Sequence, residues 1–154
     1  MRVLTFQSDK LDLSFKNNDK IFADENLCNY PNAKEVYKRL FEHYNKQKNT
    51  EYKSFFWAFS NLCTDNRTEQ IQCAKNMIGD VSIKNAKLLI LEVPDELCLA
   101  TDFYNFSDEI FAYEFPNELE SLWDTIFTTY EDRESQIIFP YITQEMIVEI
   151  IEEF

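Results

Sequence analysis

Residues 87–93 read Lys-Leu-Leu-Ile-Leu-Glu-Val, and Pro94 follows them directly. A nearly continuous apolar run of this length, closed by a proline, is typical of a β-strand that is buried on both faces. The run therefore predicts a central strand in a sheet that other elements cover from both sides.

Shorter apolar and aromatic segments on either side of this run predict further strands. Runs rich in aromatic and β-branched residues, bounded by turn-forming residues, are typical of strands. We expect them at residues 3–6, 20–23, 52–59, 97–99 and 136–139. Residues 143–154 fit two alternatives, either a helix or a helical turn followed by a last strand.

Two helices are expected in the first half of the chain. Apolar residues at a spacing of three and four indicate one helix at residues 33–44, with Asn32 as its N-cap and Glu35 three residues later. A more polar helix at residues 64–78 would begin at Thr64 or Asp65. Gly79 stands where such a helix would end.

Two more helices are expected in the second half. Thr101 and Asp102 predict an N-terminal cap for a helix that runs through Phe103, Phe106 and Ile110. Asn117 is the expected cap of the other helix. Its apolar stripe comprises Leu119, Leu122, Trp123, Ile126 and Phe127.

Length and composition point to one domain spanning residues 1–154. A chain of 154 residues with 45% hydrophobic residues can form a single core. The predicted elements give the α+β class, with one mixed, mainly antiparallel sheet and three to five helices packed around it. The aromatic segment 52–59 is expected to be core, although such a segment can also line a groove for a base or a nicotinamide ring.

Charge is distributed very unevenly along the chain. Residues 1–87 carry 14 basic and 11 acidic residues, a net charge of +3, whereas residues 88–154 carry only Arg133 against 17 carboxylates, a net charge of −16. A segment with charge of one sign must face either a basic partner or water. We expect an acidic interaction surface in this half, formed by Glu109, Glu114, Glu118, Glu120, Asp124, Glu131 and Asp132.

The glycine and cysteine content excludes several chemistries. Gly79 is the only glycine, so the glycine-rich phosphate loops and the nucleophile elbow of serine hydrolases are absent. The four cysteines, Cys28, Cys63, Cys73 and Cys98, are widely spaced and form no CxxC pair, so we expect reduced thiols. With His43 as the one histidine, which we expect to be half-buried and structural, no metal site is expected.

No targeting or membrane segment is expected. The longest apolar run is far shorter than the ~20 residues that a membrane-spanning helix needs, and residues 1–7 are too short and too polar for a signal peptide. We therefore expect a cytoplasmic protein that does not bind membranes.

Motifs spread along the chain resemble a family of small bacterial proteins known only as a domain of unknown function. The similar segments are 4–7 (LTFQ), 33–37 (AKEVY), 56–59 (FWAF), 91–96 (LEVPDE), 101–103 (TDF), 121–127 (SLWDTIF) and 136–139 (QIIF). Residues 60–86 diverge, and a Trp-His pair usual in the family is replaced at residues 105–107. The resemblance implies no known activity. It implies shared positions that form either a pocket or parts of the core and caps, namely Gln7, Trp57, Asp102, Phe103 and Gln136.

A fainter similarity, carried by residues 136–138 and 142–147, links the chain to ADP-ribosyltransferase-like folds. Those enzymes commonly place a catalytic acid at such a strand, where Glu134 or Gln136 stands here. On the first strand only Arg2 could serve as the basic partner. This resemblance implies an NAD-using enzyme, or an inactive relative, with a pocket near Gln7, Trp57 and Gln136.

Three functional hypotheses remain from the sequence. In the first, a non-catalytic protein of bacterial or phage type docks its acidic half on a basic protein or nucleoprotein, as an inhibitor of a nucleic-acid-handling or defence complex would. It would need no cofactor and would not bind nucleic acid itself, because phosphates are repelled by this charge. The alternative is the NAD-using transferase. In the third, acidity only confers solubility. The large number of aromatic residues could form either a large core or a buried dimer face, so a homodimer is also considered.

Overall fold

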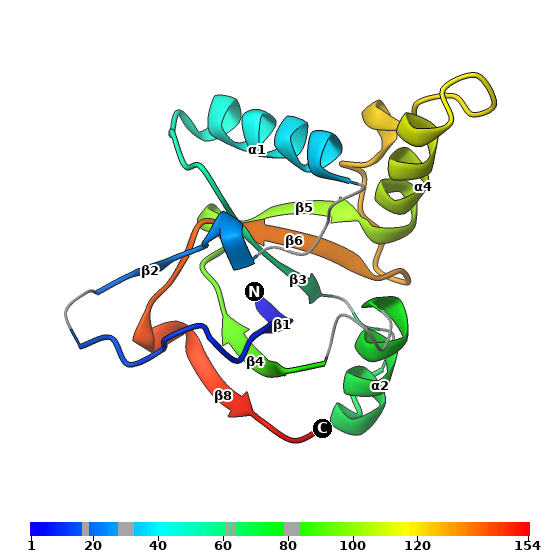
Figure 1. Cartoon of the computed structure of the whole chain (residues 1–154). Coiled ribbons are helices and arrows are strands. Elements are labelled where there is room, and N and C mark those ends of the chain that lie inside the picture. Colours follow the sequence, from blue (N-terminus) through cyan, green and yellow to red (C-terminus); the bar gives the residue numbers. More distant parts are fainter. Residues whose placement is uncertain (17–18, 28–32, 61, 63, 79–83) are drawn as a thin grey trace.

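The fold is α+β, as expected, with a six-stranded antiparallel sheet in the order β5-β6-β3-β1-β4-β8 and a two-stranded sheet of β2 and β7 (Figure 1). This computed structural model describes residues 1–154 except 17–18, 28–32, 61, 63 and 79–83. Among these residues every strand pairing is antiparallel. Three α-helices form in the same part of the chain, the smallest number in the expected range of three to five. No described helix combines the length and the apolar character that crossing a bilayer requires.

The elements have the following bounds. The strands are β1 Arg2–Ser8, β2 Ile21–Phe22, β3 Phe56–Ser60, β4 Ala86–Glu92, β5 Leu99–Asp102, β6 Ser135–Phe139, β7 Tyr141–Ile142 and β8 Ile147–Ile151. The helices are α1 Lys34–Lys48, α2 Arg67–Ile78 and α4 Phe103–Glu114. Short 3-10 helices are η1 Glu25–Leu27, η2 Asp95–Leu97, η3 Trp123–Thr125 and η4 Gln144–Met146.

Strand β4 is buried on both faces, which confirms the prediction from residues 87–93. It pairs with β1 over seven residues and with β8 on its other side. Because side chains alternate along a strand, Leu89 and Leu91 join one hydrophobic cluster while Leu88 and Ile90 join another on the opposite face. None of these four side chains is more than 7% exposed.

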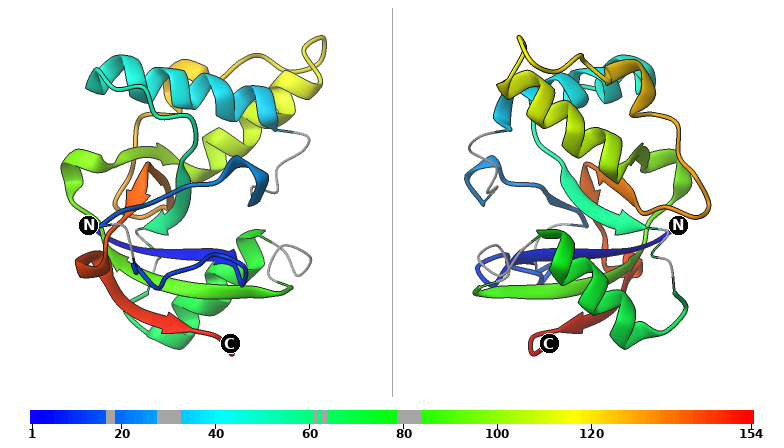
Figure 2. Two further views of the ribbon diagram at one scale, coloured as in Figure 1. Left: turned by 60° about the vertical axis from the view of Figure 1, so that its left-hand side comes forward. Right: turned by 90° about the vertical axis from the view of Figure 1, so that its right-hand side faces the viewer.

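The two faces of the sheet are covered by different parts of the chain. On the face of Leu89 and Leu91, residues 11–15 and 21–23 pack over the strands through Leu11, Phe15 and Ile21. On the other face, α1 and α4 cover the end with β5, β6 and β3, and α2 covers the end with β1, β4 and β8 (Figures 1 and 2). The sheet is therefore the middle layer of the molecule.

Local capping rules explain where the helices begin. Asp102 caps α4 as predicted, because its Oδ1 accepts a hydrogen bond of 2.8 Å from Asn105 N. Helix α2 starts later than predicted, at Arg67. Thr64 accepts from Asn66 N in the turn before the helix, and the cap is Asn66, which accepts from Glu69 N. The predicted cap Asn32 and the predicted stop Gly79 lie outside the described residues.

The predicted helix after Asn117 is wrong. Only η3 forms there, because the backbone groups that a helix would use are bound elsewhere. Leu122 N donates to the Glu109 carboxylate, and Ile126 O accepts a hydrogen bond of 2.8 Å from Asp102 N. The apolar side chains of this segment pack against α1 as separate contacts and do not form a helical stripe.

Two strand boundaries differ from the expectation, and the structure of the last residues decides between the two alternatives given for them. Residues 52–55 are not part of β3, because the Asn45 side chain at the end of α1 binds both backbone groups of Tyr52 and holds this segment as a connection. The predicted strand at 97–99 forms two residues later, as β5. At the end of the chain, η4 followed by β8 is the second of the two alternatives, a turn and a last strand.

Because β4 is buried on both faces, shortening one of its side chains should destabilise the protein more than shortening an exposed side chain of β8. Leu91→Ala removes a fully buried side chain, so we expect it to lower the free energy of unfolding by about 2–5 kcal/mol. Val148→Ala in β8, where the side chain is 47% exposed, should change it by less than about 0.5 kcal/mol. Guanidinium unfolding of both variants checks this, and similar losses would contradict the placement of β4.

Candidate functional site

The structure does not gather the five expected pocket residues into one pocket. Leu4 of β1 pairs with Phe59 of β3, so these two side chains share a face, whereas Gln7 lies on the opposite face with Thr5. Gln7 Nε2 donates to Thr5 Oγ1 at 2.6 Å. Trp57 is on the Phe59 face, separated from Gln7 by the sheet itself.

Gln136 and Phe103 do lie on the face of Trp57, but within the core. Gln136 is 3% exposed, and its Oε1 accepts a hydrogen bond of 2.9 Å from Tyr37 OH of α1. Its Nε2 has no hydrogen-bond partner among the described residues. The rings of Trp57 and Phe103 both pack edge-on to Phe59, at 5.3 and 5.6 Å between ring centroids. These contacts position α1 and α4 on the sheet.

Asp102 holds the end of β5 and the turn before β6 together. It is 0% exposed, and its Oδ1 accepts from Arg133 Nη2 at 2.8 Å in addition to its role as helix cap. The Arg133 guanidinium lies 5.2 Å from the ring centroids of both Tyr104 and Tyr130. A buried carboxylate thus binds an arginine whose cation also faces two aromatic rings.

The residues expected at the transferase acid position are buried. Glu134 is 7% exposed, its Oε2 accepts from Tyr104 OH at 2.9 Å, and its Oε1 lies 3.6 Å from Cys73 Sγ. Arg2, the basic residue considered for the same chemistry, is exposed and pairs with Glu92 at 3.0 Å. Among the described residues, grooves of about 690 and 380 Å³ lie at the other end of the sheet. A groove of about 250 Å³ is lined by Ser135 and Ile137, but Glu134 and Gln136 line none of the three.

Among the described residues no group of histidine, cysteine and carboxylate side chains is arranged to hold a metal ion. Cys73 and Cys98 are not in disulfides, and Cys28 and Cys63 lie outside the described residues. Burial raises the pKa of the Cys98 thiol to about 11, so that thiol is protonated and a poor nucleophile at neutral pH.

The expected acidic surface forms in part. The carboxylates that are exposed are Glu114, Glu118, Glu120, Asp124, Glu131 and Asp132. The prediction that Glu109 belongs to this surface is wrong, because its side chain is only 4% exposed. Its carboxylate accepts from Ser121 Oγ at 2.9 Å and from Leu122 N, and Arg39 of α1 lies 3.9 Å away. Glu109 therefore fixes the segment after α4 to the helix and is not part of the surface.

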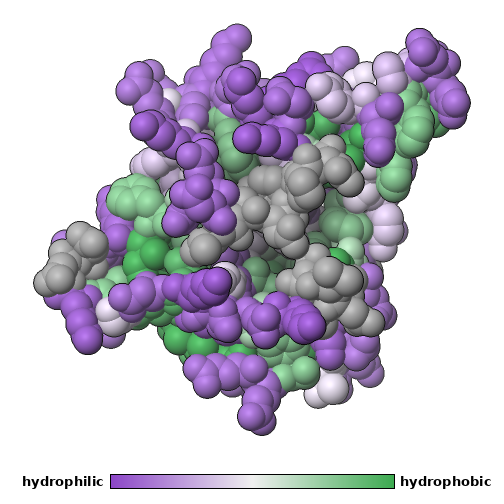
Figure 3. Space-filling model, in the orientation of Figure 1, coloured by the Kyte–Doolittle hydropathy of each residue, from purple (hydrophilic) through white to green (hydrophobic). Residues whose placement is uncertain are grey.

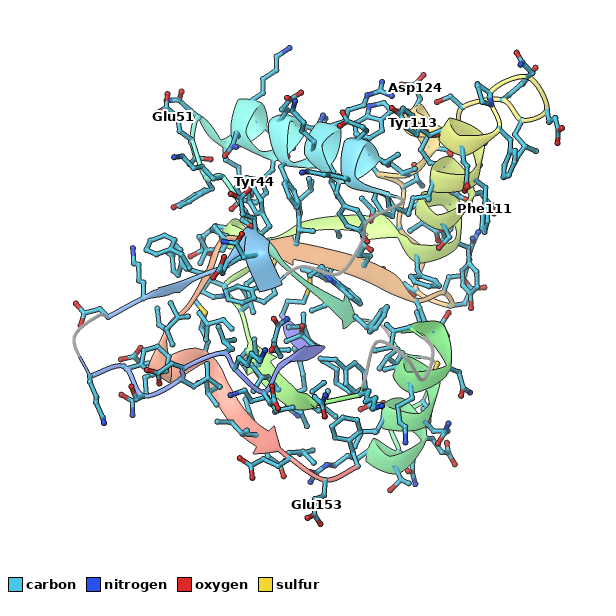
Figure 4. All side chains as sticks on the ribbon, viewed as in Figure 1. Tyr44, Glu51, Phe111, Tyr113, Asp124 and Glu153 are labelled. Atoms are coloured by element: carbon cyan, nitrogen blue, oxygen red, sulfur yellow. The ribbon has the colours of Figure 1, made fainter. Side chains whose placement is uncertain are left out.

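We call residues 111–124 the acidic tip. It forms a projecting corner of the molecule, at the end of α4 and in the loop that follows, and Figure 4 shows Phe111, Tyr113 and Asp124 there. Large apolar side chains are exposed between its carboxylates. They are Phe111 at 54%, Tyr113 at 56%, Phe115 at 46% and Leu119 at 48% exposure. The tip thus combines negative charge with exposed rings.

The helix expected through Phe103, Phe106 and Ile110 did not predict that rings at its end would be exposed. The sequence did contain an indication. Aromatic residues occur at positions 103, 104, 106, 111 and 113, so they are spread around the helix and cannot all lie on one buried face. The burial of Glu109 also had a signal. It stands three residues after the buried Phe106 and three before the buried Ala112.

Contacts with α1 hold the flank of the tip in place. The Arg39 guanidinium lies 3.9 Å from the ring centroid of Trp123, and the His43 ring stacks on Phe127 at 4.2 Å. His43 is half-buried, as expected. Burial, with a smaller effect of the Lys46 charge, lowers its pKa below the usual value. These contacts order η3 without covering the exposed rings.

Ion pairs remove part of the charge imbalance within the fold. Cations of the first half pair with carboxylates of the second in Arg2–Glu92, Arg39–Glu109 and Arg67–Glu149. The carboxylates of the tip differ from these. Among the described residues, no cation lies within 4 Å of Glu114, Glu118, Glu120 or Asp124. The negative charge of these four carboxylates is therefore not compensated by a described cation.

Comparisons with protein-family models, with curated proteins and with solved structures gave no match. The resemblances to a domain of unknown function and to ADP-ribosyltransferase-like folds therefore stay predictions.

Glu109 is expected to determine the order of the tip. Glu109→Ala leaves Leu122 N and Ser121 Oγ without their buried acceptor. We therefore expect it to lower the free energy of unfolding by about 1–3 kcal/mol and to speed hydrogen exchange of the Leu122 amide. Ser121→Ala is the control, because the carboxylate keeps Leu122 N. Ser121→Ala should lower the free energy of unfolding less than Glu109→Ala does. Hydrogen exchange and guanidinium unfolding measure both, and equal effects would show that Glu109 does not hold this segment.

The lowered pKa of His43 predicts a pH effect on stability. The folded state favours the neutral ring, while the unfolded chain binds a proton near the ordinary pKa of about 6.5. The contribution of neutral His43 is therefore present above pH ~6.5 and is lost as the pH falls through that value towards the folded pKa. We expect the unfolding free energy to fall between about pH 7.5 and 5.5, and to fall less in His43→Gln. An equal slope in both proteins would contradict this.

Proposed function

We propose that this protein is a non-catalytic binding protein of the cytoplasm of a bacterium, or of a phage that infects one, and that its acidic tip docks on a basic surface of another protein. The observation that carries the proposal is the exposure of four large apolar side chains among carboxylates that have no cation of the described residues within 4 Å. Exposed rings in one patch are costly in water and are typical of interaction sites.

The combination of rings and carboxylates favours a cationic partner. A guanidinium or ammonium group gains from the face of an aromatic ring and from a carboxylate at the same time. The protein binds two of its own arginines in this way. Arg133 lies against Tyr104 and Tyr130 while pairing with Asp102, and Arg39 lies over Trp123 near Glu109. The tip offers the same two kinds of group to solvent.

A nucleic-acid-handling or defence complex is the class of partner that this charge fits best. Such proteins carry basic channels that bind phosphates, and an acidic protein can occupy such a channel in place of nucleic acid. A net charge of −13 opposes direct binding to DNA or RNA. The NAD-using alternative has less support, because Glu134 and Gln136 are buried and are bound to neighbouring side chains.

The test compares two variants of equal net charge. Glu114, Glu118 and Glu120 are changed to Gln in the tip variant. In the control, Glu35, Glu42 and Glu51 are changed to Gln, since these carboxylates are exposed on or near α1 and Glu51 lies away from the tip (Figure 4). Each protein is immobilised and exposed to host lysate at low salt, and bound proteins are eluted with a salt step.

We expect the original protein and the control to retain the same basic protein, and the tip variant to retain at least tenfold less of it. Double-stranded DNA should displace the partner if its basic surface is a nucleic-acid channel. Adding Phe115→Ala to the tip variant should weaken retention further, because the exposed ring is part of the interface. Equal loss in the tip variant and the control would show that net charge alone drives capture, and the proposal would fail.

A further inference from the structure

The two edges of the six-stranded sheet are treated differently. At one edge lies β5, where Asp102 N donates at 2.8 Å to Ile126 O, so the returning chain takes up part of that edge. At the other edge lies β8, which pairs with β4 on one side, and no described strand pairs with its outer side. Strand β8 is at the opposite end of the molecule from α4 (Figures 1 and 2). One edge of the sheet is thus open to another strand.

Strand β8 has only partial protection against pairing with another chain, namely Glu149 and a register shift against β4. Natural edge strands commonly avoid pairing with other chains by means of lysine or proline, or by being very short. Strand β8 is Ile-Val-Glu-Ile-Ile, and Val148 and Ile150 are 47% and 43% exposed. Its pairing with β4 shifts register between Ile90 and Leu91, but four partner pairs still form. Figure 3 shows hydrophobic residues in the region of β8 next to hydrophilic ones.

Open space adjoins the end of this edge. A groove of about 380 Å³ beside α2 is lined by Ile71, Ile151 and Phe154 together with polar residues. A second groove, of about 690 Å³, shares Glu153 and Phe154 with it and extends to Asp9 and Lys87. Both grooves border the chain at and after the last residue of β8, and residues 147–150 line neither of them.

The charge along β8 indicates which kind of strand could pair with its outer side. Carboxylates flank or interrupt it at Glu145, Glu149, Glu152 and Glu153, and Glu153 points away from the body of the protein (Figure 4). Only Glu149 has a described cation, Arg67, at 2.5 Å. Two copies paired through β8 would set these carboxylates against one another, and like charges across strands are destabilising. A strand with lysine or arginine would instead compensate them.

We propose that β8 binds an extended segment of a partner protein, one that carries aliphatic and basic side chains, by adding it as a seventh strand. Backbone hydrogen bonds to the outer side of β8 supply affinity, and Val148 and Ile150 supply apolar contact. This surface is separate from the acidic tip, so the proposal does not depend on the proposed function.

The probe is a synthetic seven-residue peptide with blocked ends in which lysine and valine alternate. We expect it to bind at low salt, to shift the amide NMR signals of residues 146–152, and to slow their hydrogen exchange at least tenfold. A second peptide has the same charge but proline at its central valine, so it cannot complete the ladder. We expect it to bind at least tenfold more weakly. A third has glutamate in place of lysine and should not bind.

Two variants with the same charge change locate the site. Ile150→Lys puts a cation on the edge and should weaken binding of the Lys-Val peptide at least tenfold. Gln47→Lys, at an exposed position of α1 outside both proposed surfaces, should leave it unchanged. Shifts at residues 108–132 instead of β8, or equal binding of the proline peptide, would overturn the proposal. So would a dimer in sedimentation that Ile150→Lys dissociates, because a second copy would then occupy the edge.

Discussion

Burial of β4 on both faces is the constraint on which the rest of the structure depends. Leu88 to Leu91 put apolar side chains alternately on the two faces, so neither face of the sheet can remain in water. One face is covered by the N-terminal segment and the other by three helices. The end of α4 and the loop that follows it project from this layer as the acidic tip.

Buried polar groups join the layers and separate structural carboxylates from surface ones. Asp102, Glu109 and Glu134 are each less than 10% exposed, and each accepts hydrogen bonds that fix a connection between helices and strands. Removing a partner from such a group leaves an unsatisfied charge, which costs more than an exposed ion pair contributes. Carboxylates of the tip carry no such role, so their number and position are not required by the fold.

The sequence predicts those elements whose signals are local. Strand β4 follows from its apolar run, and α4 from a cap that binds a backbone amide three residues away. The helix after Asn117 could not be predicted correctly, since Glu109 and Asp102 compete for its backbone from other elements. Grouping Gln7 with Trp57 failed for a similar reason. Which residues share a face depends on the pairing of β1 with β3, and a shift of one residue would reverse it.

The two uncovered regions differ in physical origin. A sheet that is not closed into a barrel must have two edges, so the fold alone makes an exposed edge unavoidable. It does not make both edges equally open. Asp102 N of β5 binds Ile126 O, whereas β8 has an outer side without a described partner strand, and its side chains Val148 and Ile150 are exposed. The tip, by contrast, is exposed although polar residues could replace its rings without loss of the core. The exposed rings at one end and the unpaired side of β8 at the other are therefore features that the core does not require, and the two binding proposals rest on them.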